Sequence, residues 1–256
     1  MGGPLSWSNS YALEFDATNE AVQVDQNYSS IYAGSFSINF WIKGDGTNHN
    51  FYIWNTEGSN YSTGDRFWLN TYGEGYLDLR LRSDNNEVIW KSAYPTSNKI
   101  VPLDTNWHNV GITITKSATG TTASTIAVYV DGEPITVSST TGSVTSAQQS
   151  TWSETVDTFI GRLQVGDGSS MSPNDPFLID EIGLWNTALS AANHGAIYNS
   201  GTAMNLQADS GNYNTSANLQ AYFRFEEGSG SSTSNSVGPA DVGDLLNSPN
   251  WRITTP

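Results

Sequence analysis

Short segments in which apolar and polar residues alternate recur along the whole chain, and this period of two restricts the possible folds more than any other feature. Clear examples cover residues 36–43, 66–70, 76–82 and 109–114. Clusters of Gly, Asn, Asp and Ser separate them, and the spacing is typical of about a dozen short strands. The pattern predicts an all-β protein, a jelly-roll β-sandwich of two antiparallel sheets.

A hairpin and one short helix complete the predicted elements. The strand that ends at Val130 leads into Asp131-Gly132, a two-residue turn signal, and a second strand follows over 134–137. The stretch 189–199 is the one helical pattern, with Ser190 as its expected N-cap. Further strands are expected near residues 11–15, 21–26, 50–55, 87–92, 159–162, 177–186 and 219–225.

The composition supports a folded β protein. Charged residues make up 14% of the chain and aromatic residues 12%, which argues against a helical bundle and against a disordered chain. We expect a single domain over residues 1–256, with long loops at 138–155, 165–176 and 201–218. Residues 219–256 are too few for an independent core without cysteines, so they are expected to return to the same sandwich.

Six motifs in a fixed order resemble the laminin-G-like group of the concanavalin A-like lectin/glucanase superfamily. They lie between residues 11 and 201 and read Ala12-Leu-Glu-Phe-Asp16, Phe36-Ser-Ile-Asn-Phe-Trp-Ile42, Trp107-His-Asn-Val110, Val128-Tyr-Val-Asp-Gly132, Phe159-Ile-Gly161 and Ile179-Asp-Glu-Ile-Gly-Leu-Trp-Asn186. The segment 219–228 resembles an opening strand of such domains but lies at the C-terminus. Because the group contains sugar-binding, protein-binding and viral surface modules, the resemblance implies the fold rather than one function.

The charge excludes two classes of partner. With 25 acidic and 10 basic residues the net charge is −15, so neither nucleic acid nor an anionic membrane is an expected partner. Residues 1–6 show no secretion-signal pattern, and no apolar run is long enough to span a bilayer. The expected location is an extracellular or virion surface.

The carboxylates do not have the spacing of a glycosidase. Glu14, Asp16 and Glu20 come nearest to the paired-carboxylate pattern that the resemblance suggests, but Glu14 and Glu20 would lie about 20 Å apart on one strand. A retaining pair needs about 5–5.5 Å and an inverting pair about 6.5–9.5 Å. Asp180 and Glu181 are adjacent, so in a regular strand they would point to opposite faces.

No other chemistry has a motif in the chain. The three histidines are isolated from one another, and none belongs to a zinc motif. His108 is in phase with Val110 and Ile112, so it is interpreted as a core histidine.

The side chains that alternation leaves on the outer face of the sheet are the candidate binding site. They combine flat aromatic rings with polar groups, as sugar-binding surfaces do, and comprise Arg66, Trp68, Tyr76, Asp78, Arg80 and Arg82. Tyr52 and Trp54 are possible additions. Two alternatives stay open: the chain's own loops cover this face, or its rings form a second core layer, the reading favoured for Trp41.

Calcium is the ion that the resemblance implies. Asp16 and Asp180 are its expected ligands, because the opening strand and the Asp-Glu strand often approach each other in such domains.

We interpret the chain as a non-catalytic recognition module that binds a carbohydrate or glycoconjugate in adhesion. The first alternative is a phage-type virion or appendage protein that packs against its own copies or other virion proteins, and the second is a glycoside hydrolase.

Overall fold

The computed structural model describes residues 7–26, 28–47, 50–57, 65–72, 75–83, 86–91, 104–116, 125–136, 139–142, 157–164, 170–171, 176–238 and 242–256. For strands β7, β11, β13 and β14 it describes the backbone alone. No helix in this part of the chain is long and apolar enough to cross a membrane.

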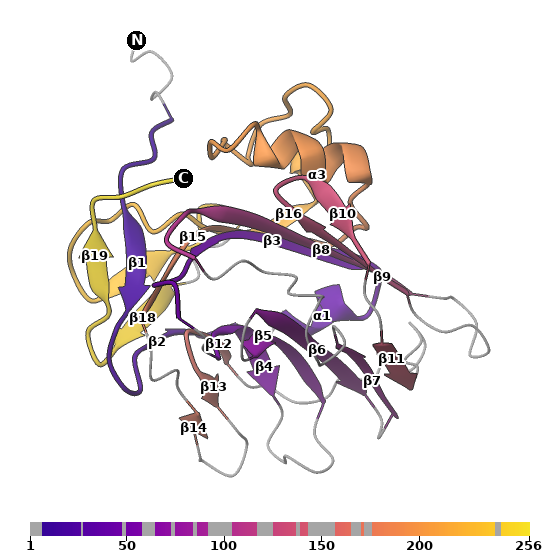
Figure 1. Ribbon diagram of the computed structural model, residues 1–256, viewed down its shortest axis with the longest axis horizontal. Helices are drawn as coiled ribbons and strands as arrows, with labels where there is room; N and C mark the ends of the chain where they lie inside the picture. Colours follow the sequence, from indigo (N-terminus) through magenta and orange to yellow (C-terminus); the bar gives the residue numbers. More distant parts are fainter. Residues whose placement is uncertain are drawn as a thin grey trace.

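Two antiparallel sheets face each other across the core, as the alternation predicts (Figure 1). In the described residues the first sheet has eight strands, ordered β10-β9-β8-β3-β15-β1-β19, with β16 paired to β15. Its strands are β1 (Ala12–Phe15), β3 (Phe36–Lys43), β8 (His108–Thr115), β9 (Thr125–Val130), β10 (Glu133–Ile135), β15 (Phe177–Trp185), β16 (Leu219–Phe223) and β19 (Asn250–Arg252).

The second sheet has nine strands within the described ranges, in the order β11-β7-β6-β5-β4-β12-β2-β18-β17. They are β2 (Ala21–Val24), β4 (Tyr52–Glu57), β5 (Arg66–Tyr72), β6 (Tyr76–Ser83), β7 (Asn86–Lys91), β11 (Ser139–Gly142), β12 (Thr158–Ile160), β17 (Ser232–Ser234) and β18 (Val242–Leu246). A two-stranded ribbon of β13 (Leu163–Gln164) and β14 (Ser170–Met171) stands apart from both sheets.

The apolar half of each alternating strand fills the space between the sheets. Phe36, Ile38, Phe40 and Ile42 on β3 all belong to this core, and none is exposed. Burying side chains of this size stabilises the fold by roughly 1.5–3 kcal/mol each. The sandwich predicted from the sequence is therefore confirmed, and so is the hairpin turn, where Asp131 and Gly132 both have positive φ.

A helix covers the outer face of the eight-stranded sheet (Figure 1). Helix α3 (Ala191–Tyr198) begins at Ser190, whose side chain forms the capping box with Asn193, so the predicted N-cap is confirmed. Trp41 is buried, and its ring centre lies 5.9 Å from that of Tyr198 on the helix. This agrees with the prediction that Trp41 belongs to a second core layer. Two short helices, α1 (Ser29–Tyr32) and η1 (Ser216–Asn218), were not predicted.

The strands after residue 218 pair with both sheets. β16 lies against β15, β19 against β1, and β18 against β2. The C-terminal segment thus contributes to both layers of the sandwich.

Candidate functional site

The outer face of the nine-stranded sheet carries the residues predicted to bind. On β5 and β6 the inward side chains are Phe67, Leu69, Leu77, Leu79 and Leu81, all in the core. Their neighbours Arg66, Trp68, Tyr76, Asp78, Arg80 and Arg82 therefore point to the other side, because successive side chains of a strand alternate. The predicted division into two faces is confirmed.

The pairing register brings the polar and aromatic groups of this face together. Trp68 lies opposite Arg80 on the neighbouring strand. The guanidinium carbons of Arg66 and Arg80 lie 4.6 and 5.2 Å from the centre of the indole ring, at cation–π distance. Arg80 also donates two hydrogen bonds to Asp78, of 3.1 and 3.0 Å. Asp78 is thus held in a fixed place beside the Trp68–Arg80 pair.

This face is not open as predicted. Trp68 and Tyr76 each retain 4% of their accessible surface, and Arg66 is also buried. The prediction of an open face is therefore wrong for these three residues. One physical reason is local: the long side chains of Arg66 and Arg80 lie against the indole and cover it. Asp78, Arg80 and Arg82 stay partly accessible.

A β-bulge separates Tyr52 from Trp54, which the sequence predicted to share the outer face. The register of β4 against β5 shifts between these two residues. Tyr52 consequently packs against Trp68 and is half-buried, whereas Trp54 turns into the core. There its indole N–H donates to the hydroxyl of Tyr32 at 2.8 Å. Trp54 is therefore a structural residue, and the prediction was wrong for it.

The same row of side chains continues across two more strands. Asn55 on β4 lies opposite Trp68 on one side and opposite Phe159 of β12 on the other. Arg162 lies over the ring of Phe159, with 4.9 Å from the guanidinium carbon to the ring centre. The predicted site residues did not include Asn55, Phe159 and Arg162. We call the whole surface the arginine–aromatic face; it comprises Tyr52, Asn55, Arg66, Trp68, Asn70, Tyr76, Asp78, Arg80, Arg82, Phe159 and Arg162.

Two amide oxygens on this face have no hydrogen-bond partner. Asn55 and Asn70 are 1% and 7% exposed, and the side-chain oxygen of each is buried without a donor. An unsatisfied buried acceptor costs about 1–3 kcal/mol. Asn55 lies opposite Trp68 on the neighbouring strand β4, and Asn70 follows Trp68 by two residues on β5, so both oxygens lie on the same face as the indole.

The two aspartates predicted to bind calcium do not meet. Asp180 lies opposite Trp41 on β3, and the register of β1 against β15 places it near Ala12, four residues before Asp16. This separation is about 13 Å along the strand. Asp180 accepts from Asn9 at 3.0 Å, and Asp16 accepts from Asn250 at 3.0 Å. The prediction that these two aspartates share a site is wrong, whereas calcium binding itself stays a prediction. In the described residues no three His, Asp or Glu side chains gather as metal ligands.

Asp180 and Glu181 form a buried acidic pair instead. A bulge interrupts β15 between residues 180 and 183, and Glu181 has a φ of 52°. Both carboxyls are therefore on the outer side of the sheet, where Glu181 accepts from the hydroxyl of Tyr222; the expectation of opposite faces was wrong. Burial, with the charge of Glu181, raises the pKa of Asp180 well above its usual value. Burial likewise raises the pKa of Glu181 to about 8, although Tyr222 and Arg224 oppose the shift.

The carboxylates nearest to a glycosidase pattern have structural partners. Glu14 pairs with Arg252. Glu20 accepts from the backbone N–H groups of Asp16 and Ala17, at 2.6 and 2.9 Å, and so closes the turn after β1. Burial raises the pKa of Glu20 despite these two hydrogen bonds.

His108 is placed differently from the prediction, and His49 lies outside the described residues. His108 is not a core residue: its Nδ1 lies 2.7 Å from Asp131 and its Nε2 lies 3.1 Å from Asp104. The hydrogen bond with Asp131 is the main cause that raises the pKa of His108. His194 is fully buried and stacked on Tyr129, with ring centres 4.3 Å apart. Burial lowers the pKa of His194 to about 3.

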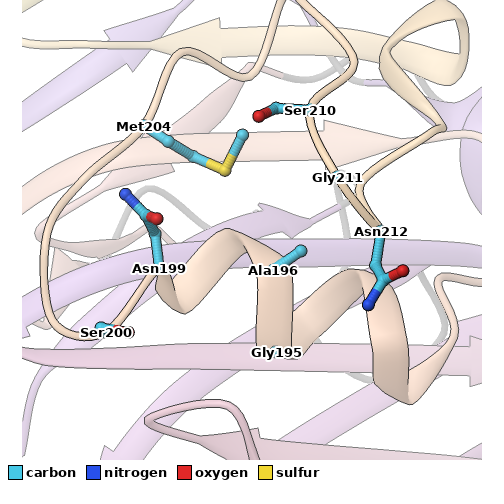
Figure 2. A pocket seen from close by; sticks show the side chains of 8 residues that line it. All are labelled: Gly195, Ala196, Asn199, Ser200, Met204, Ser210, Gly211 and Asn212. Carbon is cyan, nitrogen blue, oxygen red and sulfur yellow. The ribbon is translucent and has the colours of Figure 1, made fainter.

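A separate pocket of about 320 Å³ lies between α3 and the segment that follows it (Figure 2). Its lining is small and polar and comprises Gly195, Ala196, Asn199, Ser200, Met204, Ser210, Gly211 and Asn212. These eight residues include no aromatic ring on which a sugar could stack and no charged group. The arginine–aromatic face is therefore the better candidate for a binding surface.

The two-sheet fold, with an aromatic and polar outer face, defines the class as a lectin-like β-sandwich. The sequence gives the family: residues 16–193 match the laminin-G-like model described as the concanavalin A-like lectin/glucanases superfamily, and the chain belongs to this family. The resemblance found in the sequence motifs is thereby confirmed. No curated protein matches the chain.

Solved structures share the fold at low sequence identity. A proposed carbohydrate-binding protein from Bacteroides ovatus is 16% identical with a TM-score of 0.53, and the match covers 97% of this chain and 63% of that one. This chain therefore spans less than two thirds of that protein. A heptameric SAP-like pentraxin from Limulus polyphemus is 14% identical with a TM-score of 0.48, covering 92% and 95% of the two chains. At these identities the similarity shows the fold alone.

Proposed function

We propose that this chain is a non-catalytic glycan-recognition module that binds sugar on the arginine–aromatic face. The observation that carries the proposal is the pair of buried, unpartnered amide oxygens of Asn55 and Asn70 beside Trp68. Sugar hydroxyls donate hydrogen bonds of the kind that these two oxygens lack. A ligand that makes these bonds removes the cost of leaving buried acceptors unsatisfied.

The partly accessible residues around this pair fit the same ligand class. Tyr52 is half-buried and packs against Trp68, and its ring can stack on the C–H face of a sugar. The ion pair of Arg80 with Asp78 supplies charged donors and acceptors, with side-chain exposures of 23% and 16%. In this arrangement Trp68 is the buried platform that holds the contacting groups in place.

The family and one neighbour agree with this proposal. The family includes lectins by its description, and the Bacteroides ovatus protein is described as carbohydrate-binding. A module of this kind acts at a surface where glycans are displayed, which supports an extracellular location. The structural role in a virion has no comparable observation in its favour.

A glycan array, followed by titration of the best ligand, tests the proposal with two matched variants. Asn70→Ala removes an unsatisfied acceptor, so the free energy of unfolding should stay within about 0.5 kcal/mol of the parent value. Its affinity for the best glycan should fall at least about tenfold. Asn39→Ala is the control. Asn39 is also buried, but it lies on the eight-stranded sheet and exchanges two 2.9 Å hydrogen bonds with Asn109 of the neighbouring strand.

Asn39→Ala should lose about 1–3 kcal/mol of stability, since it removes both hydrogen bonds of the Asn109 side-chain amide. It should keep its glycan affinity at a temperature where it is folded. Unchanged binding by Asn70→Ala would contradict the site. A parent protein that binds no glycan on the array would contradict the function. Self-association through this face, without glycan binding, would favour the structural alternative.

A further inference from the structure

Arg162 is held over Phe159 by a turn that only glycine can make. β12 ends at Ile160, and Gly161 follows with a φ of +88°. A Cβ atom at this position would lie 2.4 Å from the ring of Phe15, so a larger residue would clash. The turn brings Arg162 back onto the preceding strand, 4.9 Å from the centre of the Phe159 ring. The guanidinium is thus fixed at the β12 side of the arginine–aromatic face.

Among the described residues this arginine has no counter-ion. It is half-buried, its Nε has no hydrogen-bond partner, and it forms no ion pair within the described part of the chain. The chain has 25 acidic residues against 10 basic ones, so a shortage of carboxylates is not the reason. Burial lowers the pKa of Arg162, because the partly desolvated cation lacks the negative charge that would compensate it. Arginines in this state elsewhere in proteins are paired with an anion.

Arg162 also adjoins an unsatisfied acceptor. The side-chain N–H₂ of Asn55 donates to the backbone oxygen of Arg162 at 3.4 Å, while the Asn55 amide oxygen has no donor. An acidic sugar offers both missing groups, since its anionic group accepts from the guanidinium and a hydroxyl donates to the amide. Neutral sugars offer only the second.

We propose that Arg162 binds the carboxylate or sulfate group of an acidic sugar whose ring lies on the arginine–aromatic face beside Asn55. This assignment rests on the proposed glycan-binding function and adds the charge of the ligand to it. The planar guanidinium can bind either anion through two parallel hydrogen bonds, which a lysine cannot reproduce.

An array of paired probes tests the assignment with the full chain. The probes are oligogalacturonates with their carboxyl-reduced forms, and sulfated galactose oligosaccharides with their desulfated forms. The parent protein should bind at least one acidic member about tenfold more tightly than its neutral partner, and added salt should reduce that preference. The two pairs distinguish a carboxylate ligand from a sulfate ligand.

Two arginine variants complete the experiment. Arg162→Gln should lose the preference for the acidic member and bind the neutral one within about twofold of the parent, and Arg162→Lys should recover only part of the preference. Arg252→Gln is the control, because Arg252 is exposed on β19 and pairs with Glu14; it should bind as the parent does.

Two results would overturn this inference and leave the proposed function standing. One is glycan binding without a preference for the acidic members, and the other is a preference that Arg162→Gln retains. If no glycan on a general array is bound, both fail. Should Arg162→Gln not fold, Arg162→Lys decides on the same paired probes, because a full preference in that variant would also overturn the inference.

Discussion

The imidazole of His194 occupies the space in which residue 111 would carry a Cβ atom. A Cβ built on Gly111 lies 2.2 Å from Nδ1 of the histidine and 2.7 Å from its Cε1. Helix α3 can therefore approach the eight-stranded sheet this closely because strand β8 has a glycine beneath it. The Nε2 of the same ring lies 2.9 Å from the hydroxyl of Thr113.

Gly111→Ala should consequently destabilise the protein. Its Cβ would meet a buried ring that is stacked on Tyr129, and overpacking of this kind costs about 1–3 kcal/mol. Gly195→Ala is the matched control: it lies in α3, where the nearest atom to a new Cβ is 4.0 Å away, and it should be neutral or gain up to about 1 kcal/mol. Urea denaturation of both variants measures the difference. Equal stability of Gly111→Ala and the parent would show that the helix can move away from the sheet.

His194 should also make the stability of the fold depend on pH. Burial lowers its pKa from 6.5 to about 3 in the folded protein, so between these values the unfolded chain binds the proton that the folded chain excludes. The stabilising contribution is therefore complete above pH 6.5 and falls as the pH decreases, by about 1.4 kcal/mol per pH unit.

The test compares the parent with His194→Gln by urea denaturation at pH 7, 6 and 5. The variant should be less stable at pH 7, and the gap should narrow at pH 5. A gap that stays constant over this range would mean that His194 does not exclude the proton.

Trp68 and Leu79 should both be structural, although they point to opposite faces. Leu79→Ala should cost about 2–5 kcal/mol and Trp68→Ala about 3–5 kcal/mol, because each leaves a cavity where a buried side chain was. Thermal and urea denaturation measure both losses. A fully stable Trp68→Ala protein would mean that the indole is more accessible than its 4% exposure indicates.

Alternation predicted the faces of the strands but not what covers them. It assigned Trp68 and Leu79 to the correct sides because side-chain direction depends on local backbone geometry alone. The burial of Trp68 depends on Arg66 and Arg80, and the second of these comes from another strand. Exposure is thus a property of tertiary packing, and a strand pattern does not contain it.

The other errors come from register and from single residues. Bulges at Tyr52–Trp54 and at 180–183 exchanged the sides on which Trp54 and Glu181 lie, and a one-residue shift has no signal in a short alternating run. Arg162 was missed because it lies two residues beyond the end of a three-residue strand. The glycine before Arg162 was the available signal for its position, since a glycine directly after a strand often marks a turn that redirects the next side chain.

The acidic pair should give the opposite pH dependence from His194. Burial raises the pKa of Glu181 from 4.5 to about 8, so the folded protein holds a proton that the unfolded chain has released. The contribution of Glu181 to stability is therefore complete below pH 4.5 and is lost as the pH rises toward 8. Glu181→Gln keeps the shape of the protonated group and removes the titration. Relative to this variant the parent should be least stable near pH 8 and regain up to about 1.4 kcal/mol per pH unit on acidification.

Urea denaturation from pH 4.5 to 8.5 checks this, with Glu133→Gln, on the exposed strand β10, as the control for loss of one negative charge. A gap between the parent and Glu181→Gln that is independent of pH would show that Glu181 is ionised in the folded protein, held by Arg224 and Tyr222.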